Sequence, residues 1–391
     1  MNDKQIDNGL PLPDLSIGNF RGIKEFSIPN LGRVTLLAGR NGVGKTSILE
    51  AIEVYATRAK FAVLRGMLNK REELSLALDE EGDNVLETDW SSLFHGRDIT
   101  ENGRLSVGPR QPQEQLILEA IDIGELSDEE ISGLGRWFPE SILQGETHTL
   151  RANFKGDSWT IPAFFVRDQR TRTVSGDSRR RMREFSYRTQ REESRLPAPI
   201  TYEDIGPGLI SNFALARFWD NVALTDDESN AIQALNLIYG DDVERVTMVG
   251  DDGPRRTMSG RRAVVKLKNY DRPVPLRSLG DGALRLFGVA LALANSRDGF
   301  LLIDEAENGI HYSVQQDFWR MILRTAHENN VQVLATTHSW DCVRGFAYAA
   351  TEDEKVEGTL VRIESEDSGL RTVRYSEEDL QIAAEQDIEV R

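Results

Sequence analysis

The chain has 391 residues, of which 39% are apolar and 28% charged, so it can build one large α/β domain or two smaller domains. Its formal net charge of -17 argues against a surface coated with basic residues for general nucleic-acid binding, although a local basic groove stays open. Its single cysteine, Cys342, excludes an internal disulfide and fits a reducing, cytosolic setting.

The N-terminal part of the chain predicts a tail, a hairpin, a strand and a helix. Residues 1–13 are polar and lack the apolar core of a signal peptide, so we expect a disordered tail. Apolar residues in 15–20 and 26–28 predict a hairpin, the run 34–38 predicts a buried strand, and the spacing in 47–58 predicts a helix. No apolar run in the chain could cross a bilayer, so we expect a cytoplasmic protein without a membrane partner.

Residues 59–166 predict an inserted helical and antiparallel β region. The helical pattern continues to residue 80, and the stretch to residue 115 is mixed and rich in turns. Alternating apolar residues predict three antiparallel strands, at 115–123, 147–154 and 159–166. Serine and acidic residues at its start predict a short helix at 127–137.

An arginine-rich segment follows, within a predicted loop at 167–200. Residues 167–195 contain ten arginines against five acidic residues, although the whole chain is acidic. One interpretation is contact with nucleic-acid phosphates, and a second is docking onto an acidic partner or a second copy. The third is a solvated, partly disordered loop, which the small polar residues inside the segment favour.

The remainder of the chain alternates helical and strand patterns. Residues 201–275 predict a helical arm over 202–239 and a β return with strands at 243–249 and 263–267. In the last part, 276–391, strands are expected at 300–303, 331–336, 359–363 and 370–375, and helices at 279–295, 313–329, just after 338, and 376–384. We expect 14–58 and 276–391 to form one α/β core with a mixed central sheet.

The segment between the strand at 34–38 and the following helix has the sequence GRNGVGKT, which satisfies the pattern G-x-x-x-x-G-K-[ST]. Its glycines let successive backbone N–H groups turn toward phosphate oxygens, and the helix adds its positive end. Lys45 would reach the β- and γ-phosphates, and the Thr46 hydroxyl would bind Mg²⁺. The predicted nucleotide ligands in and beside this loop are Gly39, Asn41, Gly42, Gly44, Lys45, Thr46 and Ser47.

Two later strands end in side chains that suit the same chemistry. Asp304 and Glu305 follow the apolar strand at 300–303, where two carboxylates are costly unless a cation is near. Asp304 would hold Mg²⁺ through water, and Glu305 would orient and polarise the attacking water. His338 follows the next strand and would contact the γ-phosphate. For His311 we keep two readings, a subunit interface or simple packing.

The helix expected at 279–295 opens with glycines, although Ser, Thr, Asp or Asn caps a helix better. Gly280 and Gly282 suit a helix end that meets an anion at backbone range, with Ser278 adding a hydroxyl. Because the GRNGVGKT loop already surrounds the nucleotide of its own subunit, we expect Ser278 and Gly280 to contact the γ-phosphate held by a second copy. A plain glycine-containing turn before a core helix is the alternative.

As an ordered set, LSIGNFRGIKEFSI, GRNGVGKTSILEAI, SLGDG, LLIDEAENGIH and TTHS resemble the ABC-class, AAA-type ATPases of the SMC/RecF/OLD group. The resemblance covers roughly 14–58 and 276–391 and implies a P-loop NTPase with an ABC-type head. It implies that Glu305 is the catalytic glutamate, that His338 is the switch histidine, and that Arg21 lies close to the nucleotide. The segment SLGDG departs from LSGGQ, and Gln169 is our expectation for the Q-loop residue that helps to bind the metal.

The resemblance also implies ATP and Mg²⁺ as cofactors and a homodimer that sandwiches two ATP molecules. We expect dimer engagement to control an effector protein encoded nearby, as in bacterial phage-defence ATPases, and to involve no chemistry on another substrate. A RecF-like DNA maintenance ATPase and a nucleotide-gated scaffold without turnover stay open, and a P-loop kinase is a weaker rival. The chain shows no heptad repeat, and few residues follow His338, so we expect neither long coiled-coil arms nor a Toprim nuclease.

Overall fold

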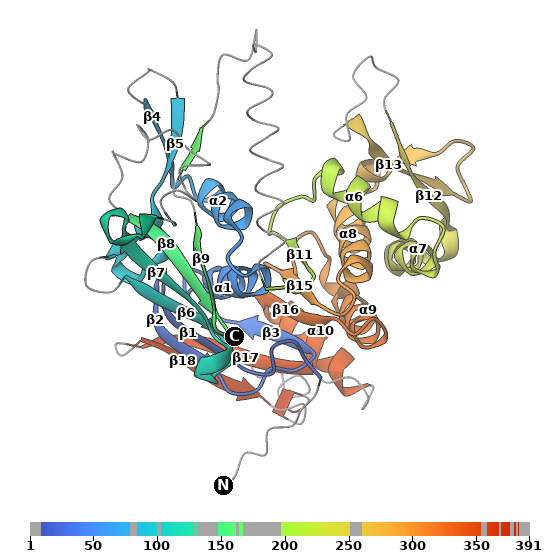
Figure 1. Ribbon diagram of the computed structural model, residues 1–391. Coiled ribbons are helices and arrows are strands. Elements are labelled where there is room, and N and C mark those ends of the chain that lie inside the picture. Colours follow the sequence, from blue (N-terminus) through green and yellow to red (C-terminus); the bar gives the residue numbers. More distant parts are fainter. Residues whose placement is uncertain are drawn as a thin grey trace, which may run out of the picture. The chain divides into compact units, whose positions relative to one another are not determined.

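The computed structural model describes residues 9–78, 84–99, 103–128, 130, 148–161, 164–166, 197–250, 260–352, 358–366, 369–375, 379–380 and 382. Figure 1 shows the helices and strands of the chain. The chain divides into two compact units. Unit 1 comprises Met1–Pro13, Asn30–Leu49 and Thr201–Arg391, and unit 2 comprises Asp14–Pro29 and Glu50–Ile200.

The centre of unit 1 is a six-stranded sheet. Its strands, in spatial order, are β11 (Tyr202–Ile205), β15 (Phe300–Ile303), β16 (Gln332–Thr337), β3 (Val34–Ala38), β17 (Gly358–Glu366) and β18 (Gly369–Tyr375). All neighbouring pairs are parallel except β17 with β18. Every residue of β3, β15 and β16 is buried, as expected for parallel strands covered on both faces.

The register of the parallel strands brings the residues that follow β3, β15 and β16 to one edge of the sheet. Ile303 pairs with Ala335, and Thr337 pairs with Ala38, so β15, β16 and β3 end at nearly the same level. The residues that follow these three strands therefore meet at the carboxyl edge of the sheet, where open α/β sheets bind ligands.

Helices and a small antiparallel sheet complete unit 1. The helices are α6 (Asn212–Val222), α7 (Asp226–Tyr239), α8 (Asp281–Asn295), α9 (Gln315–Glu328) and α10 (Trp340–Thr351), with short turns η5 (Gly240–Asp242), η7 (Leu276–Leu279) and η8 (Tyr312–Val314). The small sheet contains β12 (Val243–Val249), β13 (Arg262–Leu267) and β14 (Val274–Pro275). Helix α8 is apolar on nearly all sides and is buried over most of its length.

Unit 2 is built mainly from antiparallel strands. Its larger sheet has the order β2 (Ile23–Ile28), β1 (Leu15–Phe20), β6 (Arg104–Gly108), β7 (Leu116–Asp122), β8 (His148–Phe154) and β9 (Asp157–Ile161). A smaller sheet has the order β10 (Phe164–Val166), β5 (Asn84–Thr88) and β4 (Leu74–Leu78). The remaining elements are α2 (Phe61–Lys70), η1 (Trp90–Leu93), η2 (His95–Arg97), η3 (Pro112–Glu114) and η4 (Ile123–Glu125).

The helix α1 (Lys45–Thr57) follows β3, and the boundary between the units falls within it. The hairpin 14–29 falls in unit 2 and residues 201–275 fall in unit 1, while the expected domain organisation stays a prediction. Among the described residues, no helix is both long and apolar enough to span a membrane.

The predictions for two helical stretches were wrong. The helix expected to run to residue 80 ends at Lys70, because Glu72 adopts a positive φ of 59°, and β4 then pairs with β5. The helical pattern expected from residue 202 begins instead with β11, which pairs in parallel with β15. The helices expected at 127–137 and 376–384 lie largely outside the described residues.

Candidate functional site

The GRNGVGKT loop joins β3 to α1 as the pattern predicted. Gly39 has a φ of 156°, and a Cβ atom there would lie 2.7 Å from the carbonyl oxygen of Ile363, so a side chain does not fit. Gly42 has a φ of 79°, and no atom lies within 4 Å of the position where its Cβ would be. The loop therefore leaves its backbone open to close approach by an anion.

Lys45 begins α1 and folds its side chain back over the loop. Its Nζ donates to the carbonyl oxygens of Gly39 at 2.7 Å and of Arg40 at 2.9 Å. Burial lowers the pKa of the Lys45 ammonium, and the nearby carboxylates of unit 1 oppose that effect. A bound phosphate would favour the charged ammonium further, so this side chain suits an anionic ligand.

Two of the three predicted magnesium ligands, Thr46 and Asp304, lie next to each other. The Thr46 hydroxyl donates to Asp304 Oδ2 at 2.9 Å, and the Thr336 hydroxyl donates to Asp304 Oδ1 at 2.6 Å. Hydroxyl and carboxylate oxygens are hard ligands that suit Mg²⁺, which commonly binds through one or two carboxylates, waters and substrate phosphates. No cluster of three or more His, Cys, Asp or Glu suited to a metal occurs among the described residues. A Mg²⁺ ion held by Thr46 and Asp304 would take further oxygen ligands from phosphates and water.

Glu305 is held in a defined position beside Asp304. Its backbone N–H donates to the Thr336 hydroxyl at 2.9 Å, and its carboxylate accepts from Asn308 Nδ2 at 2.5 Å. Its φ is 51°, a left-handed conformation that costs a non-glycine residue about 1 kcal/mol. The surrounding hydrogen bonds offset this strain and aim the carboxylate.

His338 follows β16 and lies against an acidic residue that the sequence motifs did not predict. Glu307 is 10% exposed, and its Oε1 accepts from the His338 backbone N–H at 2.9 Å and lies 3.0 Å from the ring Nδ1. The sequence signal was the third acid in the run after β15, Asp304-Glu305-Ala306-Glu307. Its contact with His338 depends on the pairing of β15 with β16, which the sequence alone did not show.

Gly280 is the residue directly before α8, and Ser278 lies in the short turn η7 that precedes it. Both are exposed, Gly280 has a φ of 100°, and no side chain caps the helix. Their contact with a second copy stays a prediction. His311 is exposed, and its Nδ1 lies 2.9 Å from the Ser313 hydroxyl, so both readings of His311 stay open.

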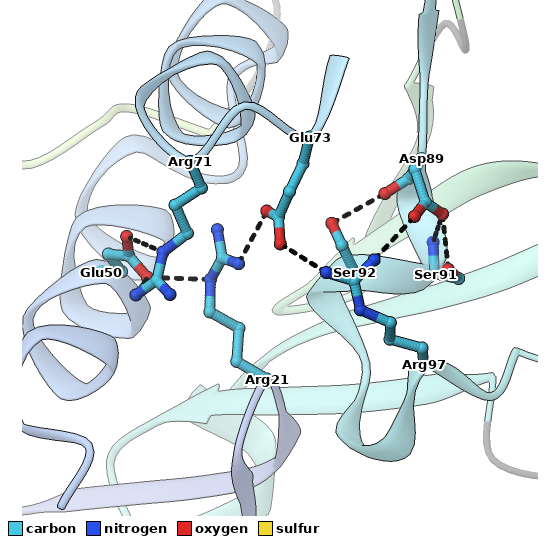
Figure 2. Close-up of polar contacts among 8 residues, drawn as sticks. All are labelled: Arg21, Glu50, Arg71, Glu73, Asp89, Ser91, Ser92 and Arg97. Atoms are coloured by element: carbon cyan, nitrogen blue, oxygen red, sulfur yellow. Dashed lines mark hydrogen bonds and ion pairs between the residues drawn. The ribbon is translucent and has the colours of Figure 1, made fainter. Parts of the chain in front are cut away.

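Arg21 lies in unit 2, in the turn between β1 and β2, where Figure 2 shows it between two carboxylates. Its Nε lies 2.8 Å from Glu50, and its Nη1 donates to Glu73 at 2.9 Å. Arg71 also pairs with Glu50, and Arg97 also pairs with Glu73. The guanidinium of Arg21 thus has acidic partners of its own, and its place beside a nucleotide stays a prediction. Gln169 and the segment 167–195 lie outside the described residues.

Residues 34–341 match the family described as "AAA domain, putative AbiEii toxin, Type IV TA system". The chain is also similar to two uncharacterized proteins of Methanocaldococcus jannaschii. One is 46% identical over 41 residues, which are 10% of this chain and 19% of that protein. The other is 34% identical over 83 residues, which are 21% of this chain and 72% of that protein.

Solved structures of SMC head domains are similar over nearly the whole chain. The Thermotoga maritima head domain is 13% identical with a TM-score of 0.42, over 94% of this chain and 100% of that one. A head domain bound to the C-terminal domain of ScpA, from Pyrococcus furiosus, is 12% identical with a TM-score of 0.47, over 97% of this chain and 99% of that one. The match over residues 34–341, with the loop after β3 and the acids after β15, shows that the chain belongs to this AAA domain family and has the predicted α/β P-loop fold.

Proposed function

We propose that this protein binds ATP with Mg²⁺ and hydrolyses it to ADP and phosphate. The observation that supports this most directly is the hydrogen bond from Thr46, in the phosphate-binding loop, to Asp304, at the end of β15. These residues are 258 positions apart in sequence, yet they lie within hydrogen-bond distance, and this supports the pair of oxygen ligands that the two motifs predict. A hydroxyl and a carboxylate oxygen are chemically suited to a hydrated magnesium ion next to a phosphate chain.

Each residue of the site then has a distinct task. The loop amides and Lys45 hold the phosphates, while Thr46 and Asp304 hold Mg²⁺, which would offset the negative charge on the phosphate oxygens. The Glu305 carboxylate orients a water molecule toward the γ-phosphate and accepts its proton. Thr336 and Asn308 keep that carboxylate in place, because they bond to its backbone and side chain, respectively.

Glu307 gives His338 a fixed orientation, because it bonds to the backbone and lies beside the ring of the same residue. A histidine held in this way at the end of β16 suits contact with the terminal phosphate. It would thereby distinguish ATP from ADP.

We further infer that two copies associate around nucleotide. The exposed, uncapped beginning of α8 supports this, since its free backbone N–H groups can meet an anion supplied by another molecule. The family description names a toxin–antitoxin system, and this supports control of an effector protein in phage defence. In this proposal ATP binding closes the dimer and hydrolysis reopens it, so that the partner is held or released.

The test compares the wild-type protein with Glu305→Gln and Lys45→Ala. We expect Glu305→Gln to bind ATP and form dimers in light scattering, with turnover at least about 100-fold lower. Lys45→Ala should lose ATP binding, while both variants should keep the wild-type circular dichroism spectrum. Equal turnover in Glu305→Gln would refute the assignment of this glutamate, and binding without any turnover in the wild type would favour a nucleotide-gated scaffold.

A RecF-like DNA maintenance function is the second candidate, and the arginine-rich composition of 167–195 favours it. It predicts that duplex DNA stimulates ATP hydrolysis and that the stimulation falls steeply with salt concentration. A preparation whose turnover does not respond to DNA at low salt would favour the effector proposal instead.

A further inference from the structure

A buried arginine of α8 lies behind the two acidic residues that follow β15. Arg285 is 4% exposed, and the other buried residues of α8 are apolar or glycine. The guanidinium makes no ion pair with a described carboxylate, and its hydrogen bonds go to main-chain carbonyl groups. This position is unusual for an arginine, because desolvating a charge is costly without a strong partner.

The carbonyl groups come from the ends of two neighbouring strands. Nη2 of Arg285 donates to the carbonyl oxygens of Asp304 at 2.8 Å and of Glu305 at 3.0 Å, while Nη1 donates to the carbonyl oxygen of Gly206. Gly206 follows β11 and Asp304 follows β15, and these strands pair directly in parallel. Arg285 therefore fixes the backbone at the points where β11 and β15 end.

The positive charge of Arg285 also lies near three carboxylates. Burial lowers the pKa of its guanidinium to about 10, while Glu307, Asp304 and Glu305 oppose that effect. The arginine thus places a positive charge near these three carboxylates, where it reduces the repulsion among them. An apolar side chain of similar length would fill the same space without this desolvation cost, so packing alone does not explain an arginine here.

The peptide unit of Glu305 is constrained from several sides. Its N–H donates to Thr336, and its carbonyl oxygen accepts from Arg285 and from the backbone N–H of Asn308 at 3.1 Å. These contacts hold a residue whose φ of 51° is unfavourable. Among them, only the contact with Arg285 comes from α8, whose beginning carries Gly280.

We propose that Arg285 is a positioning residue that couples the beginning of α8 to the backbone of Glu305. A helix moves as a rigid body, so a shift of α8 when Gly280 meets a phosphate would pass through Arg285 to the peptide of Glu305. Hydrolysis would then depend on dimer engagement through this side chain. The inference rests on the proposed ATPase function, which it extends by naming the residue that links two parts of unit 1.

The test uses Arg285→Met, which keeps the length and removes the charge, and Arg285→Lys, which keeps the charge without the planar fork. Arg58→Met is the matched control, because Arg58 is also buried, donates to the carbonyl oxygen of Tyr55 at 2.6 Å, and lies in unit 2. We expect both Arg285 variants to bind ATP within about threefold of wild type and to lose about 100-fold in kcat, since small misplacement of a reacting group costs this much. The control should keep kcat within about threefold.

Hydrogen exchange provides a readout that does not depend on turnover. Backbone amides at 304–306 should exchange at least about tenfold faster in both Arg285 variants, while Arg58→Met should leave them unchanged. If the wild type does not hydrolyse ATP, the proposed function fails, but faster exchange at 304–306 still supports the positioning role. If the Arg285 variants exchange these amides at the wild-type rate, or if Arg285→Met has the wild-type kcat, the inference is overturned. If Arg285→Met does not fold, the exchange rates of Arg285→Lys decide.

Discussion

Replacement of Arg21 with methionine removes the central group of the charge network in Figure 2. The Arg21 side chain is 5% exposed, and its two partners, Glu50 and Glu73, are each 12% exposed. After the replacement each carboxylate keeps one arginine, since Arg71 pairs with Glu50 and Arg97 pairs with Glu73. The variant therefore leaves two nearly buried acids with half of their former compensation.

The expected loss of stability follows from the burial of these groups. Breaking a buried ion pair by removing one partner costs about 3–5 kcal/mol, because the remaining charge stays desolvated. Since both acids keep a second arginine, we expect the lower end of this range, about 3 kcal/mol. Arg97 contacts the same Glu73 but is 59% exposed, so Arg97→Met should cost less than about 1 kcal/mol.

Urea unfolding followed by circular dichroism measures the two free energies, and hydrogen exchange locates the effect. In Arg21→Met we expect faster exchange in β1 and β2 of unit 2 and unchanged exchange in β15 of unit 1. If Arg21→Met and Arg97→Met lower the free energy of unfolding equally, burial does not set the strength of these contacts and the reasoning is wrong.

Three further outcomes are expected. Thr336→Val keeps the side-chain shape but removes the hydroxyl that bonds to Asp304 and Glu305. We therefore expect kcat to fall about 10–100-fold in a steady-state assay, and an unchanged kcat would contradict the site geometry. Burial lowers the pKa of the Lys45 ammonium, and a bound phosphate would raise it. Calorimetry should therefore show that ATP affinity falls as the pH rises toward 10.5, and that ATP binding takes up protons. An ATP affinity that does not change with pH would contradict this. Burial raises the pKa of the Cys342 thiol to about 12, so a disulfide reagent at pH 8 should label it only in urea, and rapid labelling of the folded protein would disprove its burial.

The sequence by itself determined those parts of the protein whose signals are local. The strand, glycine loop and helix around Lys45 are encoded within a short segment, because the glycine positions and apolar spacing follow from backbone geometry. The strand before Asp304 and the glycine at the beginning of α8 were predictable for the same reason. The order of these motifs also indicated the AAA family that the match over residues 34–341 confirms.

Only the tertiary structure decided which of these segments are neighbours. β11 has no local pattern that distinguishes it from the helices after it, and it becomes a strand because β15 offers it a parallel partner. The contacts of Glu307 with His338 and of Arg285 with Asp304 join different elements of unit 1. Such contacts depend on strand order and register, which arise from packing the whole core and which residue spacing within one segment does not specify.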